Sequence, residues 1–254
     1  MSTLIRVQSF SQAFWAGFVR ITAGRRIAGV LVGIGLMAAS VATAMVVGLH
    51  MRAGADGVNP VRGMLSDYEL VPDGWVFKLA LVIAGCGSVA LWAVLVRHHV
   101  LRGWVCMVLM ALWCAGLVGV ALFPKDPFEG SPTDRGGIHL LATAVASAAL
   151  PAVGVVLGLR HRRHGHWRQF ARITRWLAVA NVPCLLPFVI AFALNVLTRT
   201  DRFSGPATGL VERIMGGIDV ASLIVIGLWG YSAAQHREAV LVATGRRRDT
   251  QNRR

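Results

Sequence analysis

Three residues able to carry acid–base chemistry lie inside or at the ends of long apolar segments: Asp126, His139 and Asp219. An ionisable side chain inside a bilayer costs about 2.5–3.5 kcal/mol or more unless it is partnered, so such residues are functional candidates. A histidine and a carboxylate at one depth can act as general base and acid. The three are therefore candidate catalytic residues for a hydrolase or transferase acting on a lipid head group.

Two further residues bear on this hypothesis. His50 ends the first apolar segment on the same side, and two histidines with two carboxylates can hold a divalent ion such as zinc. Lys78 lies three residues into the second segment, at a depth that allows an ion pair with Asp219. In that alternative the carboxylate is neutralised and does no chemistry. The sequence contains no HExxH, GxSxG, Walker or GxGxxG motif, so the cofactor stays unknown and enzymatic activity stays open.

The connections on this side carry the other candidate binding residues, which are Asp67, Tyr68, Glu212, Arg213, Lys78 and His50. An exposed ion pair contributes at most about 1 kcal/mol, whereas a shielded one can fix loop geometry. We therefore expect the loops to fold as a cap over the helices. In this cap Arg213 should contact Asp67 or Asp126, and Tyr68 should pack over the ends of the spans.

The composition defines the elements that must position these residues. The chain has 254 residues, of which 55% are hydrophobic and only 15% charged, and its mean hydropathy is +0.59. A soluble domain carries about 25% charged residues, so a water-soluble globule is excluded. Six apolar blocks approach or exceed the roughly 20 residues that cross a bilayer. The sequence predicts an all-α polytopic membrane protein with spans at 27–50, 75–96, 103–123, 138–159, 176–197 and 214–233.

The charges predict the orientation of these spans. Most of the 26 basic residues lie at the two termini and in the second and fourth connections, whereas most of the 12 acidic residues lie in the other connections. The positive-inside rule then places both termini in the cytoplasm and the candidate site at the outer face of the plasma membrane. The net charge of +14 is explained by this distribution, so we expect no nucleic-acid partner.

The expected organisation has three parts: a cytoplasmic segment at 1–26, the six-span domain at 27–233 and a basic cytoplasmic tail at 234–254. Within the first part, Phe10, Phe14, Phe18 and Ile21 recur at helical spacing. This pattern predicts an amphipathic helix in the membrane interface, with a simple extension of the first span as the alternative.

Several short motifs keep a fixed order relative to the spans: Asn59-Pro60, Ser66-Asp67-Tyr68, Gly74, Phe123-Pro124-x-Asp126, His139 and Gly209-Leu210-x-Glu212-Arg213. In this combination the chain resembles the bacterial multi-span family known as domain of unknown function 998. The resemblance implies a compact helical bundle with the motifs on its outer face, and no established activity. A looser similarity links the chain to Frag1, DRAM and Sfk1-type membrane proteins, which are associated with lipid handling.

Three functional hypotheses follow. The first is a non-catalytic protein that binds a membrane lipid or a membrane-protein partner through a polar site at the outer face, where the motif residues join loops to helices. The second is the lipid head-group hydrolase or transferase that uses His139, Asp126 and Asp219. The third is a small-solute or ion transporter in which Asp219 is the proton or cation site.

Overall fold

A computed structural model describes residues 25–52, 58–127, 133–198 and 208–251. These residues form the long helices α2 (Arg25–Arg52), α3 (Gly74–Arg97), α4 (Trp104–Leu122), α5 (Asp134–Arg160), α6 (Arg168–Thr198) and α7 (Thr208–Gln251), with the short 3-10 helix η1 (Leu65–Leu70) between α2 and α3. All six long helices are long and apolar enough to cross a membrane, which confirms the predicted fold class. Each overlaps one predicted span, although the apolar part of α6 lies at Arg168–Ile190 rather than at 176–197. The predicted amphipathic helix lies outside the described residues.

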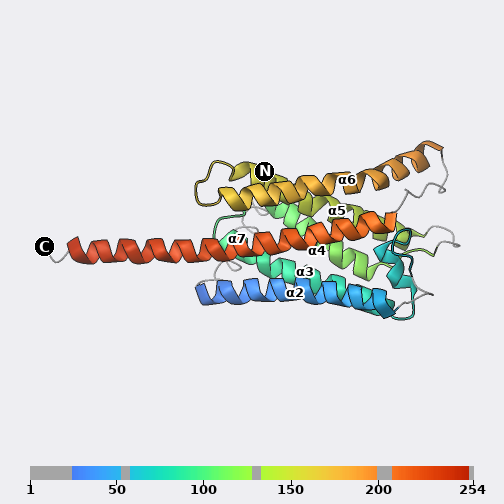
Figure 1. The fold of residues 1–254 in the computed structure, drawn as a ribbon, viewed down its shortest axis with the longest axis horizontal. Coiled ribbons are helices and arrows are strands. Elements are labelled where there is room, and N and C mark those ends of the chain that lie inside the picture. Colours follow the sequence, from blue (N-terminus) through green and yellow to red (C-terminus); the bar gives the residue numbers. More distant parts are fainter. Residues whose placement is uncertain (1–24, 53–57, 128–132, 199–207, 252–254) are drawn as a thin grey trace, which may run out of the picture.

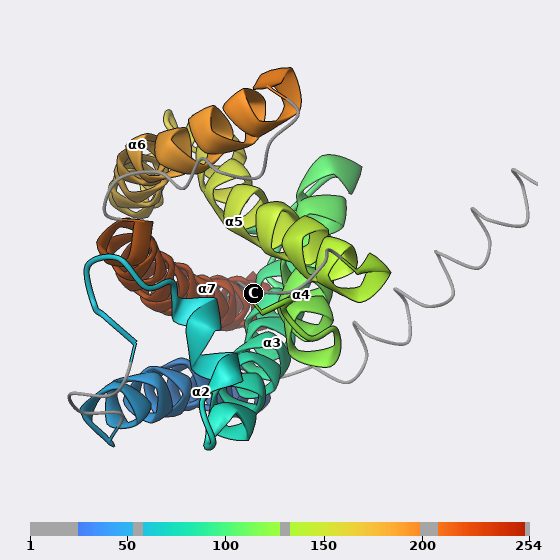
Figure 2. The same cartoon turned by 90° about the vertical axis from the view of Figure 1, so that its right-hand side faces the viewer.

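The helices form one elongated bundle. They run side by side along its long axis, with η1 at one end and α7 continuing past the other (Figure 1). We call these the cap end and the tail end, and we call residues 58–73, which include η1, the cap. Consecutive helices are neighbours, and α7 returns to pack against both α2 and α3. Figure 2, which looks onto the cap end, shows the cap lying over the ends of α2, α3 and α7.

Large apolar side chains cover the outside of the bundle. Val30, Met37 and Leu141 are each more than 60% exposed, as expected of side chains that face lipid. The interior is packed around Leu91, Val94 and Trp229, which are at most 1% exposed. The chain is therefore a multi-pass membrane protein.

Small residues set the distance between α5 and α6. A Cβ added at Gly154 would lie 2.9 Å from the Cβ of Ala178, and one at Gly158 would lie 2.9 Å from the carbonyl oxygen of Ala171. The four-residue spacing of Gly154 and Gly158 therefore lets α5 and α6 of the same chain pack closely together. Beyond this contact α6 contains Pro183 and Pro187 and leans away from the bundle toward the cap end (Figure 1).

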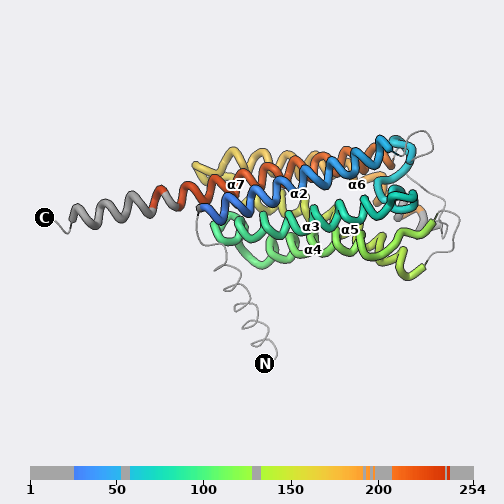
Figure 3. The backbone as a smooth tube through the Cα atoms, turned by 90° about the horizontal axis from the view of Figure 1, so that it is seen from below, coloured from blue at the N-terminus to red at the C-terminus, as the bar shows by residue number. Residues whose placement is uncertain are grey.

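Helix α7 is longer than its predicted span. It does not end at Ala233 but continues as one helix to Gln251, well outside the bundle (Figure 1). Within the bundle α7 runs beside α2 (Figure 3). Ala233 and Ala234 are still buried against neighbouring helices. The predicted boundary between the six-span domain and the basic tail therefore falls inside a continuous helix.

Candidate ligand-binding site

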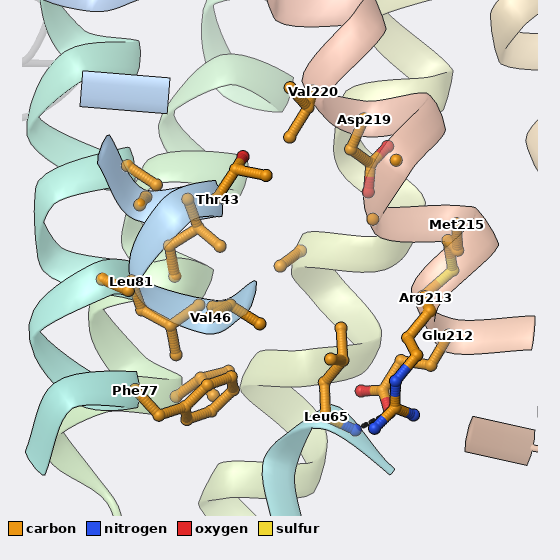
Figure 4. Close-up of a pocket in the computed structure, with 18 of the residues that line it drawn as sticks. Thr43, Val46, Leu65, Phe77, Leu81, Glu212, Arg213, Met215, Asp219 and Val220 are labelled. Carbon is orange, nitrogen blue, oxygen red and sulfur yellow. Dashed lines mark hydrogen bonds between the residues drawn. The ribbon is translucent and has the colours of Figure 1, made fainter. Parts of the chain in front are cut away.

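A cavity of about 510 Å³ lies in the half of the bundle beneath the cap, between α2, α3, α4, α5 and α7. Its volume falls within the range of about 300–1,000 Å³ that is usual for small-molecule sites. Figure 4 shows Val46, Phe77 and Leu81 on one side of the hollow and Met215 and Asp219 of α7 across it. Nearly all of the wall is apolar, so the cavity suits a hydrocarbon ligand.

The cavity reaches the outer surface of the bundle between α2 and α7. Val47 of α2 lines the cavity although it is 51% exposed, and Gly217 of α7 both lines it and is exposed. A Cβ added at Gly217 would meet no heavy atom within 4 Å. Gly216 and Ala42 line the same region, and their small size leaves space that larger side chains would fill. The opening faces the side of the bundle, where a bilayer surrounds it.

Three polar side chains meet at the cap end of the cavity. The hydroxyl of Tyr68 is hydrogen-bonded to Nδ1 of His50, and it accepts a hydrogen bond of 3.1 Å from Nη2 of Arg213. The guanidinium of Arg213 also lies over the Tyr68 ring, 5.6 Å from its centroid. Tyr68 itself is fully buried against Leu49 and Phe77, which confirms that it packs over the ends of the spans.

The expected pairing of Arg213 with Asp67 or Asp126 is wrong. Nη1 of Arg213 donates instead to the carbonyl oxygens of Gly63, at 2.8 Å, and Gly209, at 2.9 Å. Within the described ranges no carboxylate forms a salt bridge with Arg213. Its direct hydrogen-bond acceptors in the described part of the chain are therefore neutral oxygens at the mouth of the cavity, with the Glu212 carboxylate nearby.

The cap is fixed to the first turns of α7. Oε2 of Glu212 accepts a hydrogen bond of 2.6 Å from the backbone N–H of Leu65, and the N–H of Leu210 donates to the carbonyl of Val61 at 3.1 Å. Glu212 and Leu65 both line the cavity beside this bond (Figure 4). The carboxylate of Glu212 thus provides an acceptor for the first backbone N–H of η1, which lies at the cavity wall.

A second group of charges fixes the cap to the connection between α4 and α5. The ammonium of Lys125 pairs with Oδ1 of Asp67 and donates to Oγ of Ser66 at 3.1 Å. Oδ2 of Asp67 accepts a hydrogen bond of 2.7 Å from the N–H of Met64. The side chains of Lys125 and Asp67 are only 16% and 9% exposed, so this ion pair is shielded. Asp67 stabilises the cap and does not line the cavity.

The predicted ion pair between Lys78 and Asp219 is also wrong. Lys78 instead binds Oε1 of Glu69, with 2.7 Å between Nζ and the carboxylate oxygen. Oε2 of Glu69 accepts a hydrogen bond of 3.2 Å from the N–H of Lys125 and lies 3.7 Å from Nδ1 of His139. Glu69 therefore joins η1, α3 and α5, and Lys78 belongs to the framework around the cap.

Asp219 lies deeper in the cavity wall and is 7% exposed. Its Oδ1 accepts a hydrogen bond of 2.7 Å from Nδ2 of Asn181 on α6. Among the described residues, no Lys, Arg or His forms a salt bridge with it. Asp219 is thus a buried acid without a counter-ion, on the wall of an apolar cavity.

His139 and Asp126 each serve the start of α5. Nδ1 of His139 donates to the carbonyl oxygen of Phe123 at 2.8 Å, and the ring is buried. The two oxygens of Asp126 accept from the N–H of Thr133 at 2.9 Å and from its hydroxyl at 2.6 Å, while that hydroxyl caps the N–H of Gly136. The hydrogen bonds from Thr133 lower the pKa of Asp126 below its ordinary value.

The predicted layer of His50, Asp126, His139 and Asp219 does not converge. Of the three candidate catalytic residues only Asp219 lines the cavity, and each of the three has a different partner. In the described part of the chain no three His, Cys, Asp or Glu side chains come together as metal ligands. Among the residues that the structure describes, His139, Asp126 and Asp219 therefore form no acid–base pair, and no ligand set for the possible divalent metal comes together.

Sequence reasoning missed three residues that organise this region. Lys125 and Glu69 hold the cap, and Asn181 is the partner of Asp219. Asn181 carries a signal, because a buried amide in an apolar segment needs a polar partner on a neighbouring helix. Lys125 and Glu69 lie in polar connections, where their pairing depends on how two separate loops fold against each other.

These features define a class: a six-span helical membrane protein with a capped apolar cavity. The chain belongs to the family described as protein of unknown function (DUF998), whose model matches residues 37–229. No curated protein and no solved structure gives a significant match.

Two of the motifs that carry the resemblance, Asn59-Pro60 and Gly74, shape the start of the cap and its junction with α3. Oδ1 of Asn59 accepts from the N–H groups of Val61 and Arg62, at 2.9 and 3.0 Å, and so forms the turn that begins the cap. A Cβ at Gly74 would lie 2.9 Å from the carbonyl oxygen of Tyr68, so only glycine fits where η1 meets α3. These motif residues therefore serve the structure around the cavity.

Proposed function

We propose that this protein binds a membrane lipid, with an acyl chain in the cavity and the head group beside Arg213. The observation that carries the proposal is the apolar cavity of about 510 Å³ that opens sideways between α2 and α7. A ligand that enters through this opening comes from the bilayer, where hydrocarbon chains are the most abundant apolar groups. The cap covers the end of the cavity and keeps it separate from water.

The cavity serves one face of the membrane. Toward the tail end the bundle is closely packed, since a Cβ at Gly227 would lie 3.1 Å from Leu36 and 3.2 Å from Leu91. Trp229, which follows Gly227 by two residues on α7, is also fully buried. This packing favours a one-sided binding site over a passage through the membrane, and therefore lipid binding over solute transport.

The charge distribution supports an orientation. Arg97, Arg102, Arg160 and Arg237 lie at the tail end, whereas Asp67, Glu69 and Asp73 lie at the cap end. By the positive-inside rule the tail end faces the cytoplasm and the cavity opens to the outer leaflet of the plasma membrane. A reporter enzyme that is active only outside the cytoplasm, fused after Gln251, should be inactive if this orientation is correct.

The lipid proposal can be tested with a matched pair of substitutions on α2. Ala42 lines the cavity and is 7% exposed, whereas its neighbour Val41 is 42% exposed and does not line it. Ala42→Phe should fill the cavity and abolish the lipid that native mass spectrometry detects on protein extracted in mild detergent. Val41→Phe should leave that lipid in place.

A second substitution separates loss of binding from misfolding. Gly217→Trp should obstruct the lateral opening without disturbing packing, because a Cβ there meets no neighbour. Both binding variants should melt close to the wild-type temperature. Wild-type protein that carries no lipid and takes none up from vesicles would refute the proposal, as would a folded Ala42→Phe variant that keeps its lipid.

A further inference from the structure

Two polar side chains of α7, Arg213 and Asp219, are possible contact points for a ligand in the cavity. We call Arg213 the first station and Asp219 the second. Arg213 and Asp219 are six residues apart, which is about 9 Å along a helix axis. Both line the cavity, and the lining residues of α7 between them are Met215, Gly216 and Gly217. A ligand lying along α7 therefore meets Arg213 at the mouth, beside the Glu212 carboxylate that binds the N–H of Leu65, then an apolar stretch, then the acid Asp219.

The first station selects an anion. Arg213 has five N–H donors in a planar fork. Its hydrogen bonds to Gly63, Gly209 and Tyr68 do not use all of them, so N–H groups remain that can donate to a ligand. Such a fork matches the oxygens of a phosphate or carboxylate. The Tyr68 hydroxyl and the exposed His50 ring lie beside it and offer further polar contacts. A negatively charged head group is therefore the natural occupant of the mouth.

The second station offers a hydrogen-bond donor. An ionised carboxylate buried among apolar groups without a counter-ion is so costly that such an acid keeps its proton instead. Asp219 has Asn181 as its one hydrogen-bond partner within the described residues. In its neutral form Asp219 has an O–H group to donate from the cavity wall, and a carbonyl oxygen is the complement of that group.

We propose that the ligand is an acyl-ester lipid phosphate held at two points, its phosphate at Arg213 and its ester carbonyl at Asp219. This inference rests on the proposed lipid-binding function. In such a lipid the phosphate, the glycerol unit with its ester carbonyl, and the acyl chain follow one another, which is the order in which Arg213, Asp219 and the apolar end of the cavity lie along α7. The acyl chain then continues past Asp219 toward Trp113 and Leu223, which line the deep end of the cavity.

The two contact points can be tested with a set of three ligands, in which the second lacks the ester carbonyl of the first and the third lacks its phosphate. They are palmitoyl-glycerol phosphate, its ether-linked analogue without the carbonyl, and monopalmitoyl glycerol without the phosphate. Binding to the full chain in detergent is measured for each. The ester should bind about two- to tenfold more tightly than the ether, the factor of one neutral hydrogen bond, and at least about tenfold more tightly than the glycerol.

Variants assign each preference to its residue. Asp219→Leu should bind the ester and the ether equally while it keeps the preference for phosphate, and Asp219→Asn should keep the ester preference because its amide still donates. Arg213→Gln should lose the preference for phosphate and keep that for the ester. Arg213→Lys should retain most of the phosphate preference, which separates the loss of charge from a loosened cap.

The outcomes distinguish this inference from the proposed function. Equal binding of all three ligands to wild-type protein would overturn the two-point recognition and leave lipid binding intact. Tighter binding of hexadecylamine, dependent on Asp219, would show a cation site instead and would also overturn it. Inorganic phosphate alone should not compete; competition would show a free-phosphate site. Failure of every lipid to bind would contradict the proposed function itself.

Discussion

The shielded ion pair between Asp67 and Lys125 should be the main electrostatic attachment of the cap. Breaking a buried pair costs about 3–5 kcal/mol, because the remaining charge loses its partner. Both side chains are slightly exposed, and Lys125 keeps Ser66 as an acceptor, so Asp67→Asn should cost about 3 kcal/mol. The asparagine retains an oxygen for the N–H of Met64, so the substitution isolates the loss of charge.

A double-mutant cycle measures the pair directly. Lys125→Met should destabilise the protein by a similar amount, and the combination with Asp67→Asn should cost clearly less than the sum, with a coupling of at least about 1 kcal/mol. The free energy of unfolding is measured in mixed micelles. Hydrogen exchange of residues 59–70 then shows whether the loss is located in the cap.

An exposed pair in the same region provides the control. Arg52 and Asp73 lie 3.6 Å apart with side chains 76% and 43% exposed, so Asp73→Asn should change stability by no more than about 1 kcal/mol. If Asp67→Asn were as mild as Asp73→Asn, or if the two costs in the cycle simply added, the assignment of Asp67 as a structural residue would be refuted.

Three further predictions concern packing within the bundle and the titration of His98. Gly209→Ala should loosen the cap by about 1–3 kcal/mol, since its Cβ would meet the backbone of Gly63, whereas Gly217→Ala should not; hydrogen exchange in the cap would compare them. Ser88→Val should cost about 1–3 kcal/mol by removing the acceptor of the buried Trp113 indole N–H, a loss that melting curves would detect. Burial, reinforced by nearby arginines, lowers the pKa of His98 from 6.5 to about 4. The unfolded chain therefore takes up this proton first, so the melting temperature should fall as the pH drops from 6.5 to 4, and His98→Leu should reduce that slope.

The spans could be predicted because each is a local property of the chain. About 20 apolar residues without a charge can lie only in a bilayer, whatever the rest of the protein does. The importance of Tyr68 and Asp219 could be recognised for similar reasons, since a polar group at a membrane boundary or inside a span needs a structural explanation. The sequence thus indicated which end of the bundle carries the polar site.

The partners of these residues could not be predicted in the same way. Depth along a span is known from sequence only to about one turn, and the rotation of each helix is not known at all. Lys78 and Asp219 enter from the same side, yet Lys78 is turned toward Glu69 and Asp219 toward Asn181. Pairing across loops depends on the course of the cap, which places Lys125 beside Asp67 and leaves Arg213 with carbonyl oxygens.

The unbroken length of α7 has a mechanical consequence. Its 44 residues extend about 66 Å, roughly twice the thickness of the hydrocarbon core, so one stiff rod carries both the cavity residues and the basic stretch beyond the bundle. Any displacement of that stretch along the axis moves Arg213 and Asp219 by the same amount. A force on the tail along this axis would therefore reach the lipid that we propose for the cavity, and binding of that lipid would in turn be transmitted to the tail.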